Sequence, residues 1–325
     1  MIPFTLARAG HIEDAVTAGV GGQRFIAGGT TLVDLMRIGV EQPPRLLDIN
    51  ALPLDFIHAT DAGLQIGALT RMSEVAAHPA VMRDYPAIST ALLEGASPQL
   101  RNMASIAGNL LQRVRCPYFR DMTAACNKRV PGTGCASIDG FNRTQAVFGT
   151  SSACIATHPS DVAVAFVALD ARLRVQGTTG QRVFDVEDLF HLPGYTPHRE
   201  HDLNPGELIL GVEVPAANHA RRSCYLKVRD RSSYEFALVS VAAGLDIDGH
   251  RIRAVRLAAG GVGTRPWRFR EAEALVTGQL ANADTWQRAA EKCIEAAAPA
   301  AQNGFKVELL RRIVIRALTR VASDQ

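Results

Sequence analysis

Hydrophobic positions at the start of the chain switch between the period of a strand and the period of a helix. Residues 23–29 (QRFIAGG) predict a short buried strand that ends in two glycines, and apolar residues recur at helical spacing over 30–39 (TTLVDLMRIG). RLLDIN at 45–50 predicts a second strand, and 55–69 alternates around an Asp-Ala-Gly turn, as a hairpin does. This order of elements is typical of a mixed α+β fold.

The middle of the chain contains a long stretch without periodicity. Helices are predicted over 73–85 and 86–96, and small residues dominate 95–112, where the backbone must approach something closely. From about 113 to 152 neither a period of 2 nor one of 3.6 persists, which indicates a long functional loop or an insertion. Periodicity returns at 161–176 in an apolar run of helical or strand character.

A new block of structure begins after residue 218. A strand at 207–215 is followed by the basic stretch NHARRSCYLKVRDRSS, which marks a domain boundary, so we predict domains of 1–218 and 219–325. In the second domain, strands joined by the turn Asp248-Gly249 precede three helical segments between 270 and 322. This pattern predicts a small antiparallel sheet backed by helices.

The bulk properties of the chain exclude several classes of protein. With 325 residues, of which 47% are hydrophobic, the chain can bury its own core, and a formal charge of +3 gives no reason to invoke nucleic acid. It shows neither an export signal nor a long apolar span. We therefore expect no membrane insertion, and a location in the cytoplasm or, through co-export with a partner, in the periplasm.

Two loops that contain glycine are suited to binding an anion. FIAGGTTL at 25–32 brings two glycines and two threonines to a helix start, where free N–H groups and the helix dipole favour a phosphate. SIAGN at 105–109 combines a close backbone with an asparagine amide. Neither loop matches a G-x-G-x-x-G or Walker pattern, so a purely structural interpretation stands beside the binding interpretation for both. The first loop would then be a tight turn in which Thr30 or Thr31 caps the following helix, and the second an ordinary loop.

Four of the six cysteines lie in irregular sequence, at Cys116, Cys126, Cys135 and Cys154. Their spacings lack the short knuckle of structural zinc sites, whereas four separated loop cysteines can enclose a larger object, as a 4Fe-4S cluster is. Five cations outnumber Asp121 in the same part of the chain, which would favour thiolates; they are Arg113, Arg115, Arg120, Lys128 and Arg129. From the spacing, a cluster, a zinc ion, and disulfides or unligated thiols remain three alternatives, while Cys224 and Cys293 are expected in the core.

Three further features each have two interpretations. The Ser160-Asp161 pair ends a loop and opens an apolar run, so it is either part of a site or a helix cap. Lys227 and Arg229 fit charges at a strand edge better than contacts to a bound anion. His158, near Cys154, is interpreted as a hydrogen-bonded surface residue of the loop and not as a metal ligand.

Taken together, five motifs occur in the order found in the FAD-binding medium subunits of the molybdenum hydroxylase, or xanthine oxidase, family: FIAGGTTLVDLM, IAGN, SD at 160–161, PGELI at 205–209 and KVRDRSSYEFALVSVAAGL. The chain resembles these subunits over essentially its whole length. It is most similar to the FAD subunits of bacterial periplasmic aldehyde oxidoreductases, through GASPQLRNMASIAGNLLQRVRCPYF and CNKRVPGTGCA. The resemblance implies a two-subdomain FAD-binding domain of the vanillyl-alcohol oxidase and p-cresol methylhydroxylase type, followed by a small α+β C-terminal flavoprotein domain.

The resemblance also implies which residues bind FAD. The first loop is expected to wrap the pyrophosphate and the second to form the opposite wall, with Asp161 at the ribose or adenine side, Lys227 near the flavin ring and Leu203 beside the adenine or flavin. The predicted FAD residues are Ile26, Ala27, Gly28, Gly29, Thr30, Thr31, Leu32, Ser105, Gly108, Asn109, Asp161, Leu203 and Lys227. The family often has asparagine at the position of Thr31; threonine keeps a hydroxyl there but lacks the amide.

A second cofactor follows from an insertion at about 111–154, which most relatives lack. In family members that carry it, this insertion holds an additional 4Fe-4S cluster, and the ligands here would be Cys116, Cys126, Cys135 and Cys154.

The expected function is electron transfer within a heterotrimer. A large molybdenum-cofactor subunit would oxidise an aldehyde, and electrons would pass through 2Fe-2S clusters of a small subunit to FAD in this chain and on to an external acceptor. The chain has neither a molybdopterin-binding pattern nor the cysteine pattern of 2Fe-2S subunits. The alternatives are a self-contained flavin oxidoreductase of the same fold, for which no catalytic acid or base is evident, and a zinc-stabilised scaffold, which leaves both glycine loops without a ligand.

Overall fold

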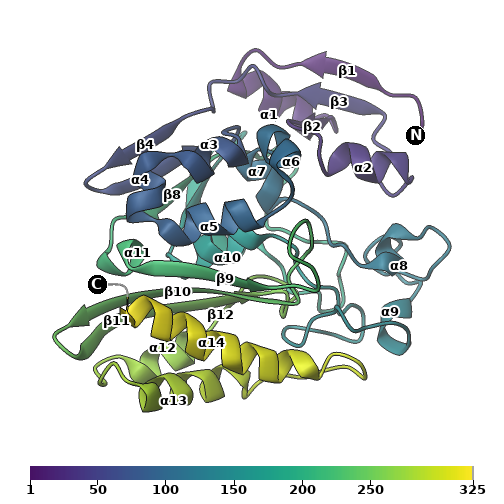
Figure 1. Cartoon of the computed structure of the whole chain (residues 1–325). Helices are drawn as coiled ribbons and strands as arrows, with labels where there is room; N and C mark the ends of the chain where they lie inside the picture. The colour runs from purple at the N-terminus through teal and green to yellow at the C-terminus, as the bar shows by residue number, and fades with distance from the viewer. Residues whose placement is uncertain (324–325) are drawn as a thin grey trace.

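The computed structural model describes residues 1–323, and these residues form three sheets with helices around them (Figure 1). The first sheet is parallel, with strand order β1-β3-β2, and lies at the N-terminal end. Its elements are β1 (Thr5–Arg8), α1 (Ile12–Val20), β2 (Arg24–Ile26), α2 (Leu32–Arg37) and β3 (Arg45–Asp48). The predicted strand, glycine turn and helix therefore exist, although β2 is only half-buried.

The second sheet has five antiparallel strands in the order β4-β5-β8-β6-β7. It contains the predicted hairpin and the strand that ends at Pro215; its members are β4 (Ile57–Thr60), β5 (Gly63–Gly67), β6 (Arg172–Gly177), β7 (Gly180–Asp185) and β8 (Leu208–Pro215). Short helices connect β5 to the middle of the chain: α3 (Met72–Ala77), α4 (Pro79–Asp84), α5 (Pro86–Glu94), α6 (Pro98–Met103) and α7 (Ile106–Leu110). The apolar run at 161–176 resolves into α10 (Asp161–Ala168) and then β6, and the 3-10 helix η1 (Val186–Leu189) follows β7.

The prediction of one helix over 73–85 is wrong, because the chain breaks into α3 and α4 at His78. The backbone of His78 is extended, with φ −69° and ψ 127°. A proline follows at Pro79, and its ring disfavours a helical conformation for the residue before it. The same proline then occupies the first turn of α4, where its missing N–H costs nothing.

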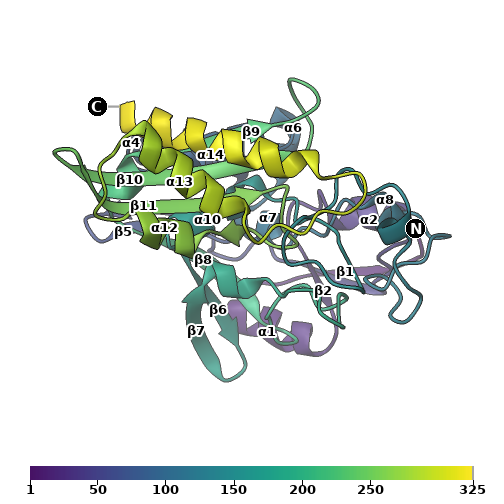
Figure 2. The same cartoon turned by 90° about the horizontal axis from the view of Figure 1, so that it is seen from below.

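The third sheet, with strand order β12-β11-β10-β9, forms the C-terminal part. Its strands are β9 (Ser223–Val228), β10 (Val239–Asp248), β11 (Arg251–Gly260) and β12 (Trp267–Arg268), and α11 (Asn218–Arg221) precedes them. Figure 2 shows α13 (Ala283–Ile294) and α14 (Phe305–Ser323) lying over β10 and β11, with α12 (Arg270–Val276) beside them. This arrangement is the helix-backed antiparallel sheet that the sequence predicts.

The third sheet is buried on both faces. Alternate residues of β10 face opposite sides, so that Val241 packs in the core shared with α13 and α14, while Ala242 packs in the core shared with α5 and α10. Tyr225 of β9 also packs in the core that is shared with α5 and α10. The side chains of this sheet can therefore reach toward the middle of the molecule.

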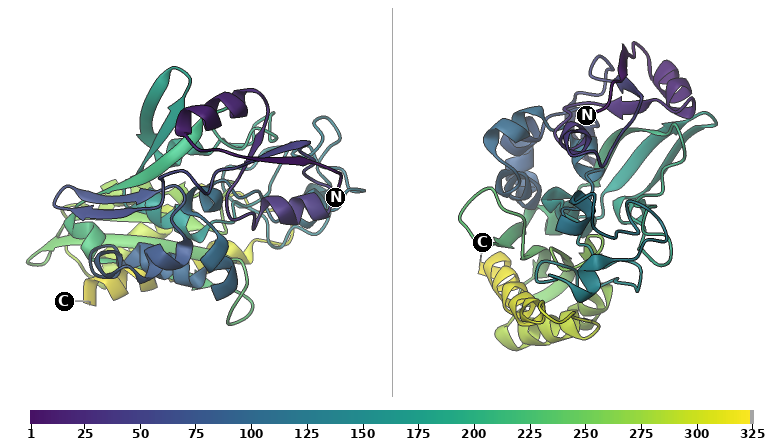
Figure 3. Two further views of the ribbon diagram at one scale, coloured as in Figure 1. Left: turned by 90° about the horizontal axis from the view of Figure 1, so that it is seen from above. Right: turned by 90° about the vertical axis from the view of Figure 1, so that its right-hand side faces the viewer.

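The cysteine-rich segment forms mostly irregular structure, as predicted. Its regular parts are α8 (Pro117–Arg120) and α9 (Ala136–Asp139), and it lies at the same end of the molecule as the N-terminus (Figures 1 and 3). A small core of its own includes Phe119, Val114 and Leu35 of α2. None of the helices within residues 1–323 is both long and apolar enough to cross a membrane.

Candidate functional site

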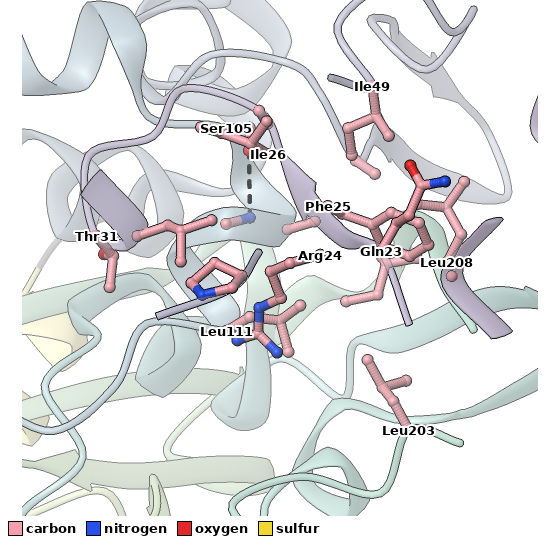
Figure 4. A pocket seen from close by; sticks show the side chains of 18 of the residues that line it. Gln23, Arg24, Phe25, Ile26, Thr31, Ile49, Ser105, Leu111, Leu203 and Leu208 are labelled. Carbon is pink, nitrogen blue, oxygen red and sulfur yellow. Dashed lines mark hydrogen bonds between the residues drawn. The ribbon is translucent and has the colours of Figure 1, made fainter. Parts of the chain in front are cut away.

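Two cavities meet at the glycine turn that follows β2. The first, here called the N-terminal cavity, has a volume of about 540 Å³ and is bounded by residues 22–32, by the start of α7 and by residues 203–209. Figure 4 shows Ile26 and Ser105 on one side of it and Leu203 on the opposite side. Cavities of this size are typical of small-molecule sites.

The second, here called the central cavity, has a volume of about 570 Å³. It shares Thr30, Thr31 and Gly108 with the N-terminal cavity, so the two cavities adjoin at these residues. Every residue predicted to bind FAD lines one or both cavities. The N-terminal cavity has Ile26, Ala27, Gly28, Gly29, Thr30, Thr31, Leu32, Ser105, Gly108 and Leu203, and the central cavity adds Asn109, Asp161 and Lys227.

The glycine turn is pressed against the segment that leads into α7. A Cβ atom on Gly28 would lie 1.8 Å from the Met103 carbonyl oxygen, and Gly29 has φ +70°, which glycine adopts at least cost. On the second wall, the backbone N–H of Gly108 donates to Ser105 Oγ at 3.2 Å, so Ser105 caps α7. The segment after β2 is therefore a tight turn, and the same residues line the N-terminal cavity, so the two interpretations do not exclude each other.

Thr31 precedes α2 without capping it through its side chain. Its hydroxyl instead accepts a long hydrogen bond of 3.5 Å from Arg115. Arg115 and Arg120 both pair with Asp34 in α2, at 3.3 and 2.7 Å, and the hydrogen bond from Arg120 holds the pKa of Asp34 below its usual range. Sequence reasoning missed Asp34; its position one helical turn after Thr31 was the available signal.

A buried polar cluster forms one wall of the central cavity. Lys227 Nζ lies 2.8 Å from Asp161 Oδ2 and donates to the Glu94 carbonyl oxygen at 3.0 Å, and the Tyr225 hydroxyl donates to Asp161 Oδ1 at 2.5 Å. The Lys227 side chain is 1% exposed and that of Asp161 is 9% exposed. Burial raises the pKa of Asp161, while Lys227 and Tyr225 oppose that change. Tyr225 was not among the predicted site residues.

This cluster bears on two expectations. Lys227 lies on β9, an edge strand of the third sheet, but its side chain is buried and paired with Asp161. The charged atoms of Asp161 and Lys227 are 2.8 Å apart, so the two residues meet at one place in the lining of the central cavity, whereas the prediction assigned them to the adenine side and the flavin side. Ser160 does cap α10, with its hydroxyl accepting from Ala163 N at 3.0 Å and donating to Asn109 Oδ1 at 2.6 Å.

We expect Lys227→Met to lower the free energy of unfolding by about 3–5 kcal/mol, because it leaves the Asp161 carboxylate buried without its cation. Equilibrium unfolding in urea measures this change. The matched control is Lys292→Met, which breaks ion pairs at the solvent-exposed surface with Glu271 and Glu295 and should change stability little. An unfolding midpoint in Lys227→Met equal to that of the parent would contradict the buried pairing.

The four clustered cysteines line one small cavity beside the central one. Cys116, Cys126, Cys135 and Cys154 surround it together with apolar residues such as Val114 and Phe119. Cys126 and Cys135 face each other in an isolated antiparallel bridge. None of the six cysteines, all of which lie within residues 1–323, forms a disulfide, so the disulfide alternative is wrong for this structure.

The segment's cations do not favour thiolates as expected. Burial raises the pKa of Cys116, and it raises the pKa of Cys154 to about 11 in spite of Lys128. Most of the cations are already neutralised: Arg113 pairs with Glu41 and Glu200, and Lys128 pairs with Glu200. The remaining one, Arg129, donates to the backbone carbonyls of Tyr118, Phe119 and Ala124.

Within residues 1–323, no three His, Cys, Asp or Glu side chains stand close enough together to hold one metal ion. The single-zinc alternative therefore gains no support from the described side chains. The four clustered thiols nevertheless line one common space, with a volume of about 10 Å³.

His158 has the hydrogen-bonded role that the sequence favoured. Its Nδ1 accepts from the Ser160 backbone N–H at 3.4 Å, its backbone N–H donates to the Gly263 carbonyl oxygen at 3.1 Å, and its ring contacts Phe190 edge-on. Burial lowers the pKa of His158 to about 4.

The low pKa of His158 predicts a loss of stability in acid. Between the unfolded value of about 6.5 and the folded value of about 4, the unfolded chain binds a proton that the folded chain does not, so the free energy of unfolding falls as the pH falls. His158→Asn should make this slope shallower in urea unfolding measured across that range. His11→Asn, at an exposed histidine, is the control. Equal slopes for the parent and His158→Asn would contradict the assignment.

Two family models cover nearly all of the chain. A model of the FAD binding domain in molybdopterin dehydrogenase matches residues 2–217, and a model of the CO dehydrogenase flavoprotein C-terminal domain matches residues 224–321. The chain is 49% identical to the aldehyde oxidoreductase FAD-binding subunit PaoB of Escherichia coli strain K12, over 100% of both chains. It is 26% identical to the glyceraldehyde dehydrogenase medium chain of Sulfolobus acidocaldarius, over 98% of both.

Solved structures show the same fold. A chain of reconstituted CO dehydrogenase from Oligotropha carboxidovorans superimposes with a TM-score of 0.78 at 20% identity, covering 100% of both chains. A chain of quinoline 2-oxidoreductase from Pseudomonas putida 86 gives a TM-score of 0.76 at 21% identity, covering 99% of this chain and 97% of that one. The expected α+β fold, a flavin-binding domain followed by a small flavoprotein C-terminal domain, is confirmed.

Proposed function

Because the chain belongs to the family of FAD-binding subunits of molybdopterin dehydrogenases, we propose that it is the FAD- and 4Fe-4S-containing electron-transfer subunit of a molybdenum-dependent aldehyde oxidoreductase complex. It would receive electrons from 2Fe-2S clusters of a small partner subunit and pass them to an external acceptor. The aldehyde assignment rests on the relatives named as an aldehyde oxidoreductase subunit and a glyceraldehyde dehydrogenase medium chain. A large molybdenum-cofactor subunit would carry the substrate chemistry.

The adjoining cavities fit FAD in size and in chemistry. Their shared section at Thr30, Thr31 and Gly108 offers hydroxyls and backbone N–H groups, which suit the diphosphate in the middle of the cofactor. Arg115 and Arg120 share the single carboxylate of Asp34, so this wall keeps positive charge for a diphosphate with about two negative charges. FAD, when bound, supplies a redox centre that accepts electrons singly and releases them in pairs.

We propose that each cavity holds one end of the cofactor. Leu203 and the largely apolar N-terminal cavity would hold the adenosine half. Asp161 and Lys227 would both lie at the flavin half in the central cavity, where each can offer one charged group to ring polar atoms. The pairing of these two residues also holds the flavin end together with the third sheet, since Lys227 belongs to β9.

The cysteine cavity fits a 4Fe-4S cluster by its donor set. The observation that carries the proposal is the convergence of four free thiols from separate parts of residues 116–154 on one space next to the central cavity. A bound cluster supplies a one-electron carrier. Loss of the thiol protons on metal binding would offset the effect of burial on Cys116 and Cys154. We also propose a domain division after residue 218, supported by the limits of the two family matches.

Cofactor analysis of the purified complex tests this function. We expect FAD together with about four iron atoms and four acid-labile sulfides beyond those of the 2Fe-2S clusters, as one 4Fe-4S cluster carries. FAD without the additional iron would refute the cluster and leave the flavin assignment standing. Absence of FAD would refute the electron-transfer role as a whole.

A further inference from the structure

Resting on the proposed cluster site, we propose that Gln145 is a positioning residue that holds the Cys116 sulfur by an N–H···S hydrogen bond and thereby raises the reduction potential of the cluster. Gln145 Nε2 lies 3.5 Å from Cys116 Sγ. The side chain is buried, with 1% of the residue exposed. A distance of this length is a hydrogen bond when the acceptor is the large sulfur atom.

The C-terminal helix fixes the backbone of Gln145. Its carbonyl oxygen accepts from Lys306 Nζ at 2.9 Å and from Asn303 Nδ2 at 3.2 Å, and its N–H donates to the Asn142 carbonyl oxygen at 3.0 Å. Lys306 also donates to the carbonyl oxygens of Thr144 and Gly261, at 2.8 and 2.7 Å. The backbone from which the Gln145 side-chain amide extends is therefore held in place by hydrogen bonds.

The burial of these anchors indicates how strongly this position is held. Lys306 and Asn303 are both 0% exposed, and the three described hydrogen bonds of Lys306 Nζ go to carbonyl oxygens and not to a carboxylate. Burying an ammonium group is costly unless its donors are satisfied. A lysine in this place stabilises one conformation of residues 144–145, which is the conformation that points the Gln145 amide at Cys116.

Gln145 and Cys116 both line a third cavity of about 160 Å³, and this cavity shares Arg115, Asp161 and Phe236 with the central cavity. Cys126, Cys135 and Cys154 are not among the residues that line it. The hydrogen bond therefore acts on the cysteine that borders the space next to the proposed flavin end.

A donor to a ligand sulfur stabilises the more negative, reduced state of an iron–sulfur cluster. The cysteine cavity is lined mainly by apolar atoms from residues such as Val114, Phe119 and Ala156, so one amide dipole is weakly screened there. A hydrogen bond that is about 1.4 kcal/mol stronger to the reduced cluster than to the oxidised one changes the ratio of reduced to oxidised cluster tenfold.

The test is a redox titration of the complete complex, followed by the EPR signal of the reduced 4Fe-4S cluster. In Gln145→Met, which keeps the size of the side chain and removes the donor, the ratio of reduced to oxidised cluster at a fixed potential should fall about tenfold, equal to a shift of about 59 mV to more negative potential for one electron. Gln176→Met is the matched control, since Gln176 donates to the Gly177 carbonyl oxygen in the distant β6–β7 hairpin. Its titration should match that of the parent.

The outcomes separate this inference from the function on which it rests. A Gln145→Met complex with a full cluster and the parent potential would overturn the hydrogen bond while the cluster assignment stands. A parent complex without additional iron would refute the cluster, and the inference with it.

If Gln145→Met does not assemble a cluster, the hydrogen bond can be tested in the parent complex with ¹⁵N in its glutamine side-chain amides. Pulsed EPR of the reduced cluster should detect a coupled side-chain nitrogen, and the absence of this coupling would overturn the proposal.

Discussion

Gly28→Ala is expected to lower the affinity of the chain for FAD by roughly 10- to 100-fold, as overpacking of about 1–3 kcal/mol predicts. The added methyl group would lie 1.8 Å from the Met103 carbonyl oxygen, 2.6 Å from the Met103 carbonyl carbon and 3.2 Å from Ala104 N. All three are backbone atoms, so no side-chain rotation relieves the clash. The turn and the segment that enters α7 must move apart, and these are the two walls of the shared section between the cavities.

The measurement is the ratio of FAD to protein after purification, followed by titration of the stripped chain with FAD. Gly10→Ala is the matched control: a Cβ atom there meets nothing within 4 Å, and Gly10 lies in the same N-terminal part of the chain. If Gly28→Ala contained as much FAD as Gly10→Ala, this result would contradict the proposed binding of FAD at the glycine turn. Circular dichroism of both variants separates a local change in the turn from unfolding.

The parts of this site that the sequence could predict are those built from neighbouring residues. The glycine turn after β2 and the Ser105 cap of α7 depend on contacts over a few positions, so composition and spacing are sufficient to find them. The same holds for the hairpin of β4 and β5 and for the helices after residue 270. The break at His78 was missed although its cause, Pro79, is local, because the apolar pattern continues across it.

The charged partners could not be predicted, because they come from positions far apart in the chain. Asp161 and Lys227 are 66 residues apart, and Asp34 lies 86 residues before Arg120. A count of cations in the cysteine segment therefore suggested a basic pocket, whereas the fold supplies Asp34 and Glu200 to neutralise Arg120 and Lys128. Which charges remain unpaired is a property of the tertiary structure, and so is the burial that raises the pKa of Cys116 and Cys154.

These pairings also join the two proposed cofactor sites. Arg115 and Arg120 belong to the cysteine segment, but their partner Asp34 lies in α2, directly after the glycine turn. Arg113 similarly links Glu41, at the edge of the N-terminal cavity, to Glu200 and so to Lys128 beside the cysteines. The cysteine segment is thus attached to the proposed flavin site by partly buried ion pairs and is not an independent unit.

Cys116→Ser is expected to abolish the 4Fe-4S cluster while FAD is retained. A serine hydroxyl is a poor ligand for iron compared with a thiolate, and a 4Fe-4S cluster needs four cysteine ligands, so about four iron atoms per FAD should be lost. The broad absorption shoulder on the flavin bands should disappear with them. FAD remains because Cys116 does not line the N-terminal or central cavity.

Cys293→Ala is the matched control, since Cys293 is a buried cysteine of α13 that packs in the C-terminal core. It should keep both the iron and the flavin, which shows that removing a thiol is not sufficient for cluster loss. Unchanged iron in Cys116→Ser would exclude Cys116 as a ligand. Loss of FAD together with the iron would show instead that FAD binding depends on an intact cysteine segment, through the ion pairs of Asp34 and Glu41. An Asp34→Asn variant with a full cluster but reduced FAD content would confirm that dependence.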